Sequence, residues 1–183
     1  IDADVLAREV VTPGKPALVE IVAIFGKDVL LPDGALDRKR LGALVFADAR
    51  ARARLEAITH PAIRRAMLTE TAALASQGHA LGFYDVPLLY EVGIDRDLDC
   101  VVLVYAPRAV QLARVMSRDG LTPAEAEARL AAQWPIDDKL ARADLVVWND
   151  GDLDALSAKA APVLAALQAG LGKKPAGAAA KRY

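Results

Sequence analysis

Residues 80–91, which read ALGFYDVPLLYE, decide the fold of this chain. Their first half is apolar and aromatic, which predicts a buried strand over residues 80–86. Proline cannot donate a hydrogen bond to a sheet ladder, so Pro87 ends this strand. Asp85 then stands at the carboxyl end of a buried strand, which is where open α/β sheets place ligand sites. The alternative is that Asp85 only caps the turn that follows.

Two further apolar runs follow, at residues 100–105 (CVVLVY) and 145–148 (LVVW). Continuous runs rich in β-branched residues are typical of parallel strands that are covered on both faces. Helical patterns separate the three runs. This alternation predicts an α/β fold with a parallel sheet and right-handed crossovers.

The composition narrows the class of protein. A length of 183 residues favours one domain, and a formal net charge of -1 provides no basic field to attract nucleic acid. No apolar run approaches the ~20 residues of a membrane span, and no signal peptide is visible, so we expect no membrane partner. The single cysteine, Cys100, excludes an intramolecular disulfide and agrees with a cytoplasmic location. The oligomeric state cannot be deduced.

Two aspartates open the chain, in the sequence IDAD of residues 1–4. These residues resemble the end of a strand that leads into a helix, and aspartates at i and i+2 can both reach a cation or a hydroxyl proton. The alternative is that one of them is a helix N-cap, and of Asp2 and Asp4 we expect Asp4 to be the cap.

Several helices are predicted over residues 15–78. One spans residues 17–25, a second begins at Asp37, and a third runs over residues 48–58. A fourth begins at the sequence THP of residues 59–61, because proline is favoured at the first helical position. His60 either caps this helix or lies with Arg64 and Arg65 at the mouth of an anion site.

A second group of helices follows the strand at residues 100–105. Residues 122–125 (TPAE) form a capping box with proline at the first helical position, which predicts a helix start. This helix has only a thin apolar stripe, so it either belongs to a mobile lid over residues 119–139 or is an ordinary surface hairpin. A last helix is predicted over residues 153–167, and a disordered tail over residues 170–183.

The chain resembles the dephospho-CoA kinase family, through motifs that occur in that family's order between residue 1 and about residue 167. These motifs are the opening IDAD with AREVV and PG after it, His60-Pro61, the sequence DVPLL with Glu91, QLAR with Arg118-Asp119, Gln133, and Ala143-Asp144 leading to Asn149. Each motif is short. Their joint order and spacing carry the resemblance.

The resemblance implies a P-loop kinase fold, an α/β architecture with a three-layer parallel sheet and a small helical lid, over residues 1–169. The residues at 15–78 would then be acceptor-side helices. The implied reaction transfers the γ-phosphoryl group of ATP to the ribose 3′-hydroxyl of dephospho-CoA, in the last step of coenzyme A biosynthesis. Mg²⁺ is the implied cofactor, and ATP and dephospho-CoA are the implied partners.

The resemblance also implies roles for individual residues. Asp2 would accept the proton of the attacking hydroxyl and help to order Mg²⁺, with Asp85 on the magnesium side of the site. Arginine suits phosphate binding, because its planar fork pairs two oxygens at once. The acceptor side would comprise Arg8, His60, Arg64, Pro87, Leu88 and Leu89, and the ATP side Arg114, Arg118, Asn149 and Gly151, with Arg118 also catalytic.

One departure from the family is large. The family begins with a strand and a glycine-rich loop that ends in Gly-Lys-Ser/Thr, and the 183 residues contain no such loop. The missing strand would be central, between the strands at 80–86 and 100–105, and burying it would contribute about as much as the ~5–15 kcal/mol by which a whole domain is stable. We therefore expect that an upstream segment is absent from this sequence, or that a partner chain supplies a strand. We also expect the 183 residues alone to be inactive.

Two other functions fit parts of the sequence. The chain could be a different P-loop nucleoside or nucleotide kinase, against which the DVPLL motif argues by resemblance. It could also be a non-catalytic fragment that binds a CoA-like ligand or a partner chain, which the absent phosphate loop favours.

Overall fold

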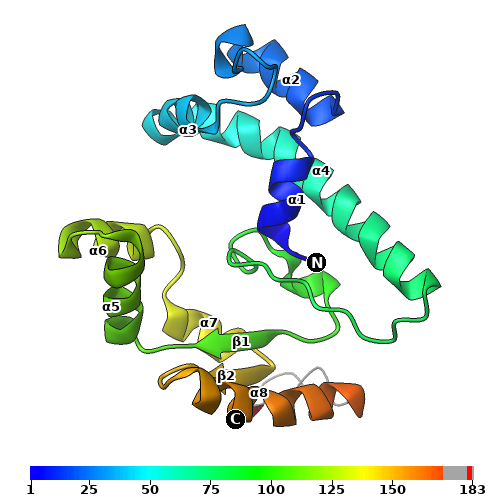
Figure 1. Ribbon diagram of the computed structural model, residues 1–183, viewed down its shortest axis with the longest axis vertical. Coiled ribbons are helices and arrows are strands. Elements are labelled where there is room, and N and C mark those ends of the chain that lie inside the picture. Colours follow the sequence, from blue (N-terminus) through cyan, green and yellow to red (C-terminus); the bar gives the residue numbers. More distant parts are fainter. Residues whose placement is uncertain (171–180, 183) are drawn as a thin grey trace. The chain divides into compact units, whose positions relative to one another are not determined.

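A computed structural model describes residues 1–170 and 181–182 of the chain (Figure 1). The chain divides into two compact units, Ile1–Val86 and Pro87–Tyr183. Among the described residues, helices are the regular elements of the first unit, and the second carries the parallel strands.

Aspartate side chains cap the starts of helices in the first unit. Asp37 Oδ1 accepts a hydrogen bond from Arg40 N at 2.9 Å, and Asp48 Oδ1 accepts one from Arg50 N at 2.7 Å, so both aspartates are N-caps as predicted. The elements are α1 (Ala3–Glu9), α2 (Pro16–Phe25), the 3₁₀ helix η1 (Lys27–Val29), α3 (Arg38–Ala47) and α4 (Ala49–Ser76).

The core of the first unit lies between α4 and the shorter helices. α1, α2 and α3 each pack against α4, the long helix in Figure 1. The buried cluster consists of Val11, Ala17, Ile21, Val29, Leu41 and Ile58. These apolar side chains are what hold the predicted acceptor-side helices together.

The predicted helix start at residues 59–61 is wrong. α4 runs without interruption from Ala49 to Ser76 and contains Pro61 in its interior. An interior proline removes one backbone hydrogen bond and costs about 3 kcal/mol. The helix continues because residues on both sides of the proline, Ile58 and Met67, are buried, so tertiary packing outweighs the local penalty.

The second unit contains the sheet. Its strands β1 (Val102–Tyr105), β2 (Leu145–Trp148) and β3 (Lys181–Arg182) are parallel and lie in that order, and Val102 pairs with Leu145. The strand predicted at 145–148 is confirmed, and the one predicted at 100–105 begins two residues later. The helical elements are η2 (Ile94–Asp97), α5 (Arg108–Asp119), α6 (Pro123–Ala131), α7 (Ile136–Arg142) and α8 (Leu153–Gln168).

Helices cover both faces of β2, which explains its unbroken apolar sequence. Leu145 and Val147 pack with Val163 of α8, whereas Val146 belongs to a cluster that includes Ile136 and Leu140 of α7. The sequence thus predicted an α/β unit with parallel strands correctly. The larger three-layer sheet that the resemblance implies stays a prediction.

The strand predicted over residues 80–86 is wrong. Asp85 forms an isolated parallel bridge with Asp2, and the rest of this segment has no ladder. Leu81 and Phe83 are 38% and 54% exposed, so the apolar residues that suggested a buried strand are not buried. An extended segment becomes a strand only if a neighbouring segment pairs with it, and here residues 1–3 pair with it at one point.

The helices of the second unit show one confirmed start and one unpredicted element. Thr122 and Glu125 form the predicted capping box at the start of α6, and Gly120 ends α5 at a φ of 66°. α7 was not predicted, because seven residues show no clear helical period. The predicted disordered tail lies outside the described residues, except for Gly170 and the two residues of β3.

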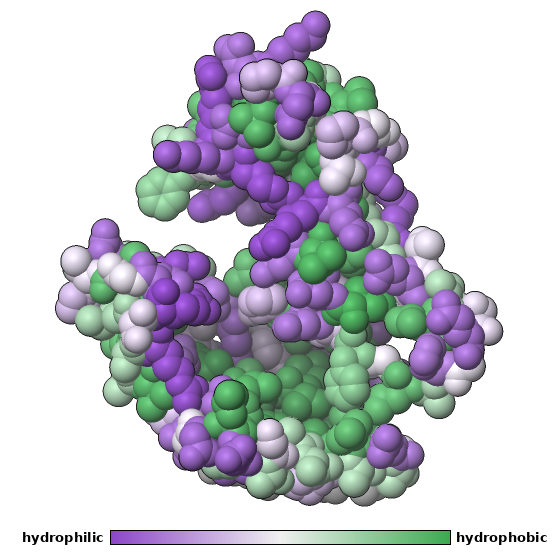
Figure 2. Space-filling model, viewed as in Figure 1, coloured by the Kyte–Doolittle hydropathy of each residue, from purple (hydrophilic) through white to green (hydrophobic). Residues whose placement is uncertain are grey.

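The surface shown in Figure 2 mixes hydrophobic and hydrophilic residues. Several large apolar side chains are exposed, and Phe46 is the most exposed of them at 91%. Among the helices of the described residues, none combines the length and the apolar character that crossing a membrane requires.

Candidate active site

Asp2 and Asp85, the two predicted magnesium ligands, are neighbours in the first unit. They are paired in a parallel bridge, in which Asp85 N donates to Ile1 O at 2.8 Å and Ala3 N donates to Asp85 O at 3.0 Å. Residues directly opposite each other in a ladder present their side chains to the same face. Both side chains are exposed, so the bridge places two carboxylates side by side at the surface of this unit.

Asp2 also caps α1, and the prediction that Asp4 is the cap is wrong. Asp2 Oδ1 accepts hydrogen bonds from Asp4 N at 2.7 Å and from Val5 N at 3.1 Å. The bridge to Asp85 gives Asp2 the extended backbone of an N-cap, with φ -106° and ψ 119°. The helix therefore starts at Ala3, closer to the N-terminus than a cap at Asp4 would allow. One carboxylate oxygen is thereby fixed, while Oδ2 has no hydrogen bond within the described part of the chain.

This pair of carboxylates fits a magnesium ion that is shared with a nucleotide. Mg²⁺ in phosphoryl-transfer enzymes is bound by one or two carboxylates, with waters and substrate phosphates as the other ligands. No group of three or more His, Cys, Asp and Glu residues that could hold a metal occurs among residues 1–170 and 181–182.

Three predicted acceptor-binding residues come from α1 and α4, which pack against each other. Arg8 lies in the last turn of α1. His60 and Arg64 are one turn apart on α4, so they lie on the same side of that helix. All three side chains are exposed.

Pro87, Leu88 and Leu89, the other predicted acceptor residues, open the second unit in a series of turns. Leu89 is buried, whereas Leu88 is 42% exposed. Backbone hydrogen bonds from Val92 N to Leu88 O and from Ile94 N to Leu89 O hold the turns together. The Pro87 carbonyl receives its hydrogen bond from a side chain, Lys139 Nζ, at 3.1 Å.

Sequence reasoning missed the ion pair behind these turns. Lys139 Nζ lies 2.7 Å from Glu91 Oε1, and the two side chains are only 7% and 15% exposed. Burial tends to raise the pKa of Glu91, but hydrogen bonds from Lys139 and from Trp134 N outweigh it and leave the pKa below its ordinary value. The sequence shows Glu91 as one acid among many. Its place in an apolar stretch and after the DVPLL motif marked it, but nothing in the sequence pairs it with Lys139.

Three of the predicted ATP-binding residues lie together. Arg114 of α5 donates from Nη1 to Asn149 O at 2.9 Å and from Nη2 to Gly151 O at 3.0 Å. The guanidinium thus holds the turn after β2 by its backbone. Gly151 packs tightly against α8, because an added Cβ there would lie 3.2 Å from Ala155 Cβ.

Arg118, the fourth, lies one turn further along α5 and pairs with an acid instead. Its Nε and Nη2 donate to the two carboxylate oxygens of Asp119 at 2.8 and 2.9 Å, and Arg129 of α6 also donates to Asp119, at 2.8 Å. Hydrogen bonding to Arg118 lowers the pKa of Asp119. A guanidinium that grips a carboxylate in this way has the fork geometry that also suits a phosphate.

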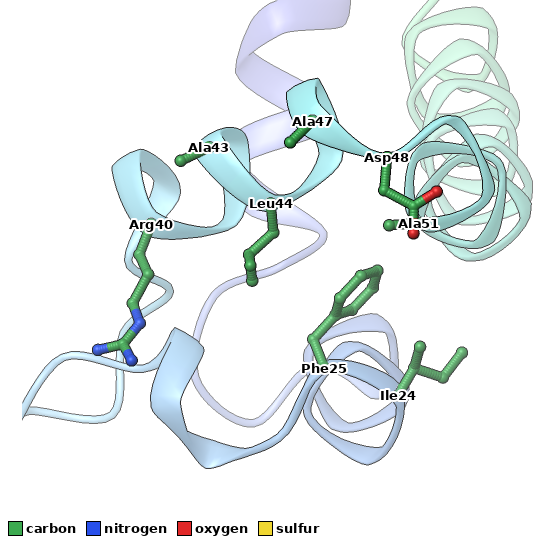
Figure 3. A pocket seen from close by; sticks show the side chains of 8 residues that line it. All are labelled: Ile24, Phe25, Arg40, Ala43, Leu44, Ala47, Asp48 and Ala51. Carbon is green, nitrogen blue, oxygen red and sulfur yellow. The ribbon is translucent and has the colours of Figure 1, made fainter.

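A pocket in the first unit lies apart from these residues. Its volume is about 590 Å³, and Figure 3 shows Phe25 of α2 and Leu44 of α3 pointing into it, with Arg40 at one side. Its lining also includes Ile24, Ala43, Ala47, Asp48 and Ala51. None of the predicted site residues lines it, so we do not assign the chemistry to this pocket.

Comparison with known proteins connects the site to a family. The model of the family described as "Dephospho-CoA kinase" matches residues 1–155. A dephospho-CoA kinase of Anaeromyxobacter dehalogenans is 62% identical over 183 residues, which are 100% of this chain and 87% of the relative. A dephospho-CoA kinase of Geobacter sulfurreducens is 52% identical over 156 residues, which are 85% of this chain and 79% of the relative.

Solved structures agree with the sequence comparisons. The crystal structure of TT1252 from Thermus thermophilus has a TM-score of 0.75 and 35% identity, and the match covers 91% of this chain and 83% of that one. A dephospho-CoA kinase from Campylobacter jejuni has a TM-score of 0.69 and 32% identity, with coverage of 93% and 85%.

Proposed function

The chain belongs to the dephospho-CoA kinase family, and on that premise we propose that it transfers the γ-phosphoryl group of ATP to the ribose 3′-hydroxyl of dephospho-CoA. The products are coenzyme A and ADP, so the reaction is the last step of coenzyme A biosynthesis. One observation carries this proposal: the family model spans residues 1–155, and every predicted site residue lies within that range. With ATP as the donor, the expected location is the cytoplasm.

Asp2 orients the acceptor hydroxyl in this proposal. Its Oδ1 is held by two backbone N–H groups, so the carboxylate cannot rotate freely, and Oδ2 is left to accept a hydrogen bond from the 3′-hydroxyl. As the hydroxyl oxygen attacks the γ-phosphorus and the bond to the ADP oxygen breaks, the hydroxyl proton passes to Asp2 and from there to solvent. Phosphoryl transfer depends mainly on positioning and on charge stabilisation, and a fixed carboxylate supplies positioning.

Asp2 and Asp85 would be the residues that hold a divalent ion, and the proposal names that ion as Mg²⁺. A bound Mg²⁺ would neutralise part of the negative charge on the phosphates of the nucleotide. Two exposed carboxylates on one face of the Asp2–Asp85 bridge support this assignment. The backbone bridge keeps the two side chains in register whether or not a metal is present.

Arg114 and Arg118 of α5 would have different roles in binding ATP. Arg114 keeps the turn at Asn149 and Gly151 in place through two carbonyl groups, and that turn would border the adenine. Arg118 would exchange Asp119 for the phosphates of ATP, because both partners offer a pair of anionic oxygens to the same fork. Residues 119–139 would form the lid that carries this exchange.

In this proposal the acceptor side would combine basic side chains with an apolar wall. Arg8, His60 and Arg64 would attract the phosphates of dephospho-CoA, and all three are exposed on helices that pack together. Pro87, Leu88 and Leu89 would form the wall. An exposed Leu88 beside a buried Leu89 supports this division, because it leaves apolar surface available for a ligand.

Turnover with different acceptors tests the proposal. Protein that includes the expected upstream phosphate loop should produce ADP and coenzyme A from dephospho-CoA when ATP and Mg²⁺ are supplied, whereas the 183 residues alone should be inactive. The protein with this loop should turn over nucleosides and nucleotides at least about 10³-fold less efficiently in kcat/KM. Preference for a nucleoside or nucleotide would favour a different kinase. Binding of dephospho-CoA without ADP formation would favour the non-catalytic alternative.

A further inference from the structure

Two charged groups are buried behind residues 87–89. Lys139 is 6% exposed, and its ammonium group lies 2.7 Å from Glu91 Oε1. Glu91 Oε2 is buried as well and has no hydrogen-bond partner among the described residues. Removing two charges from water is costly, and an apolar pair of similar volume often stabilises a protein as well or better. A site that keeps such a pair is therefore a candidate for a role other than stability.

The Glu91–Lys139 pair joins two backbone segments that are distant in sequence. Lys139 Nζ donates to Pro87 O at 3.1 Å, and Glu91 Oε1 accepts from Trp134 N at 2.9 Å. Pro87 begins the turns that precede η2, whereas Trp134 lies in the connection from α6 to α7. One ion pair thus fixes the backbone at the predicted acceptor wall and at Trp134, which lies within the predicted lid of residues 119–139.

Contacts to the Trp134 ring also hold the connection from α6 to α7. The rings of Tyr90 and Trp134 are stacked, with centroids 6.4 Å apart and planes at 10°. The guanidinium carbon of Arg142 lies 5.2 Å from each ring centroid. Glu91 therefore binds the backbone of residue 134 while Tyr90 and Arg142 hold its side chain, so this connection has little freedom to shift.

We propose that Glu91 and Lys139 are positioning residues, which hold the acceptor wall at residues 87–89 and the α6–α7 connection in one arrangement through a shared buried ion pair. Neither side chain contacts substrate. Lys139 acts by fixing the Pro87 carbonyl, and Glu91 acts by fixing the Trp134 N–H group. The inference rests on the proposed function, because it takes residues 87–89 as part of the acceptor site.

A role in positioning can be distinguished from a role in stability because each contact requires a hydrogen-bonding group. The Pro87 carbonyl needs a donor at position 139, and the Trp134 N–H group needs an acceptor at position 91. The double variant Glu91→Leu/Lys139→Met removes both charges and fills a similar volume, but it supplies neither hydrogen bond. Compared with Lys139→Met alone, this double variant should recover stability, but it should not recover the positions of residues 87–89 and of the α6–α7 connection.

The experiment measures thermal stability and steady-state kinetics of the protein with its expected upstream phosphate loop, for wild type, Lys139→Met and the double variant Glu91→Leu/Lys139→Met. We expect Lys139→Met to lower Tm markedly and the double variant to recover most of the loss. We expect KM for dephospho-CoA to stay at least 10-fold raised in both variants, while KM for ATP changes less than 3-fold. A double variant that recovers wild-type KM together with Tm would overturn the proposal.

The matched control is an exposed ion pair. Arg52 and Glu56 of α4 lie 4.0 Å apart with side chains 59% and 49% exposed, and neither belongs to the proposed site. The same replacement there, Arg52→Met/Glu56→Leu, should change neither Tm nor either KM. An equal rise in KM for dephospho-CoA in this control would also overturn the proposal, because the effect would then not depend on the buried pair.

A measurement on the wild type decides the question if the variants do not fold. Hydrogen exchange at Trp134 N–H should slow at least 3-fold when dephospho-CoA is added and stay unchanged when ADP alone is added. Unchanged exchange on acceptor binding would contradict the proposal. Failure of the proposed function is distinguishable, since it would appear as an absence of coenzyme A formation by the wild-type protein.

Discussion

Asp85 and Glu91 stand in the same stretch of sequence, at residues 80–91, and the structure gives them opposite surroundings. Asp85 is exposed and, among the described residues, is held through its backbone by the bridge to Asp2. Glu91 is largely buried and is held through its side chain, by Lys139 and Trp134 N. An acid that meets solvent and ligands is available for chemistry. A buried and paired acid fixes the groups around it.

This difference separates two kinds of effect that substitutions should show. Changes at the exposed carboxylates should alter turnover and leave stability nearly unchanged. Changes at the Glu91–Lys139 pair should mainly lower stability. They should alter the kinetics indirectly, because the acceptor wall at residues 87–89 would shift. Substitutions and a change of pH can distinguish effects on turnover from effects on stability, from the largest expected effect to the smallest.

Asp2→Asn in the protein that includes the upstream phosphate loop should have the largest effect on activity. Asparagine caps a helix as well as aspartate does, so the free energy of unfolding should change by less than ~0.5 kcal/mol. The amide cannot accept the hydroxyl proton, so kcat should fall by about 10²- to 10⁴-fold. Steady-state kinetics and urea unfolding check both parts. Asp154→Asn, in the first turn of α8, is the control, and an equal fall in kcat there would remove Asp2 from its role.

Lys139→Met should have the largest effect on stability. Glu91 would remain buried without its countercharge, which typically costs about 3–5 kcal/mol. Asp85→Asn should cost less than ~0.5 kcal/mol, because the exposed carboxylate keeps only a backbone bridge. Urea unfolding monitored by circular dichroism measures both. Similar losses in the two variants would contradict the contrast between exposed and buried acids.

Acid should weaken the contribution of Glu91. Its pKa is lower in the folded chain than the ordinary value of 4.5, so the folded state binds fewer protons than the unfolded state. The resulting stability is present above pH 4.5 and is lost as the pH falls through the folded pKa. The difference in unfolding free energy between wild type and Glu91→Gln should therefore shrink between pH 6 and about pH 3. A difference that does not vary with pH would show that Glu91 is not charged in the folded chain.

Thr122→Ala should have the smallest effect. Thr122 is the N-cap of α6 and shares a capping box with Glu125, so its loss should lower stability by about 1 kcal/mol. Hydrogen exchange in the first turn of α6 should become faster to the same extent. Thr69→Ala is the matched control, because Thr69 lies inside α4 and bonds only to the carbonyl of Arg65. Faster exchange of α4 in that control would mean that the effect is not one of capping.

Local chemistry predicted much of the fold. The caps Asp37 and Asp48, the capping box at Thr122 and the bounds of β2 were all predicted, because each depends on a few adjacent residues. The family and its reaction also followed from short motifs in order, and the family comparison confirms the assignment.

The predictions that failed depend on distant partners. Asp2 rather than Asp4 became the N-cap because Asp85 pairs with residue 2, and Pro61 stayed inside α4 because tertiary packing buries that helix on both sides of it. The strand expected at 80–86 did not form a ladder beyond Asp85. In each case the local preference was real, and a contact from elsewhere in the chain outweighed it or failed to support it.

By itself the sequence determined the α/β class, most helix starts and the family, because these depend on spacing along the chain. Only the tertiary structure decided which acid is exposed and which is buried. It paired Asp2 with Asp85, and Glu91 with Lys139, across long sequence separations. The physical reason is that charge and burial arise from all surrounding atoms, and folding brings those atoms together from distant positions.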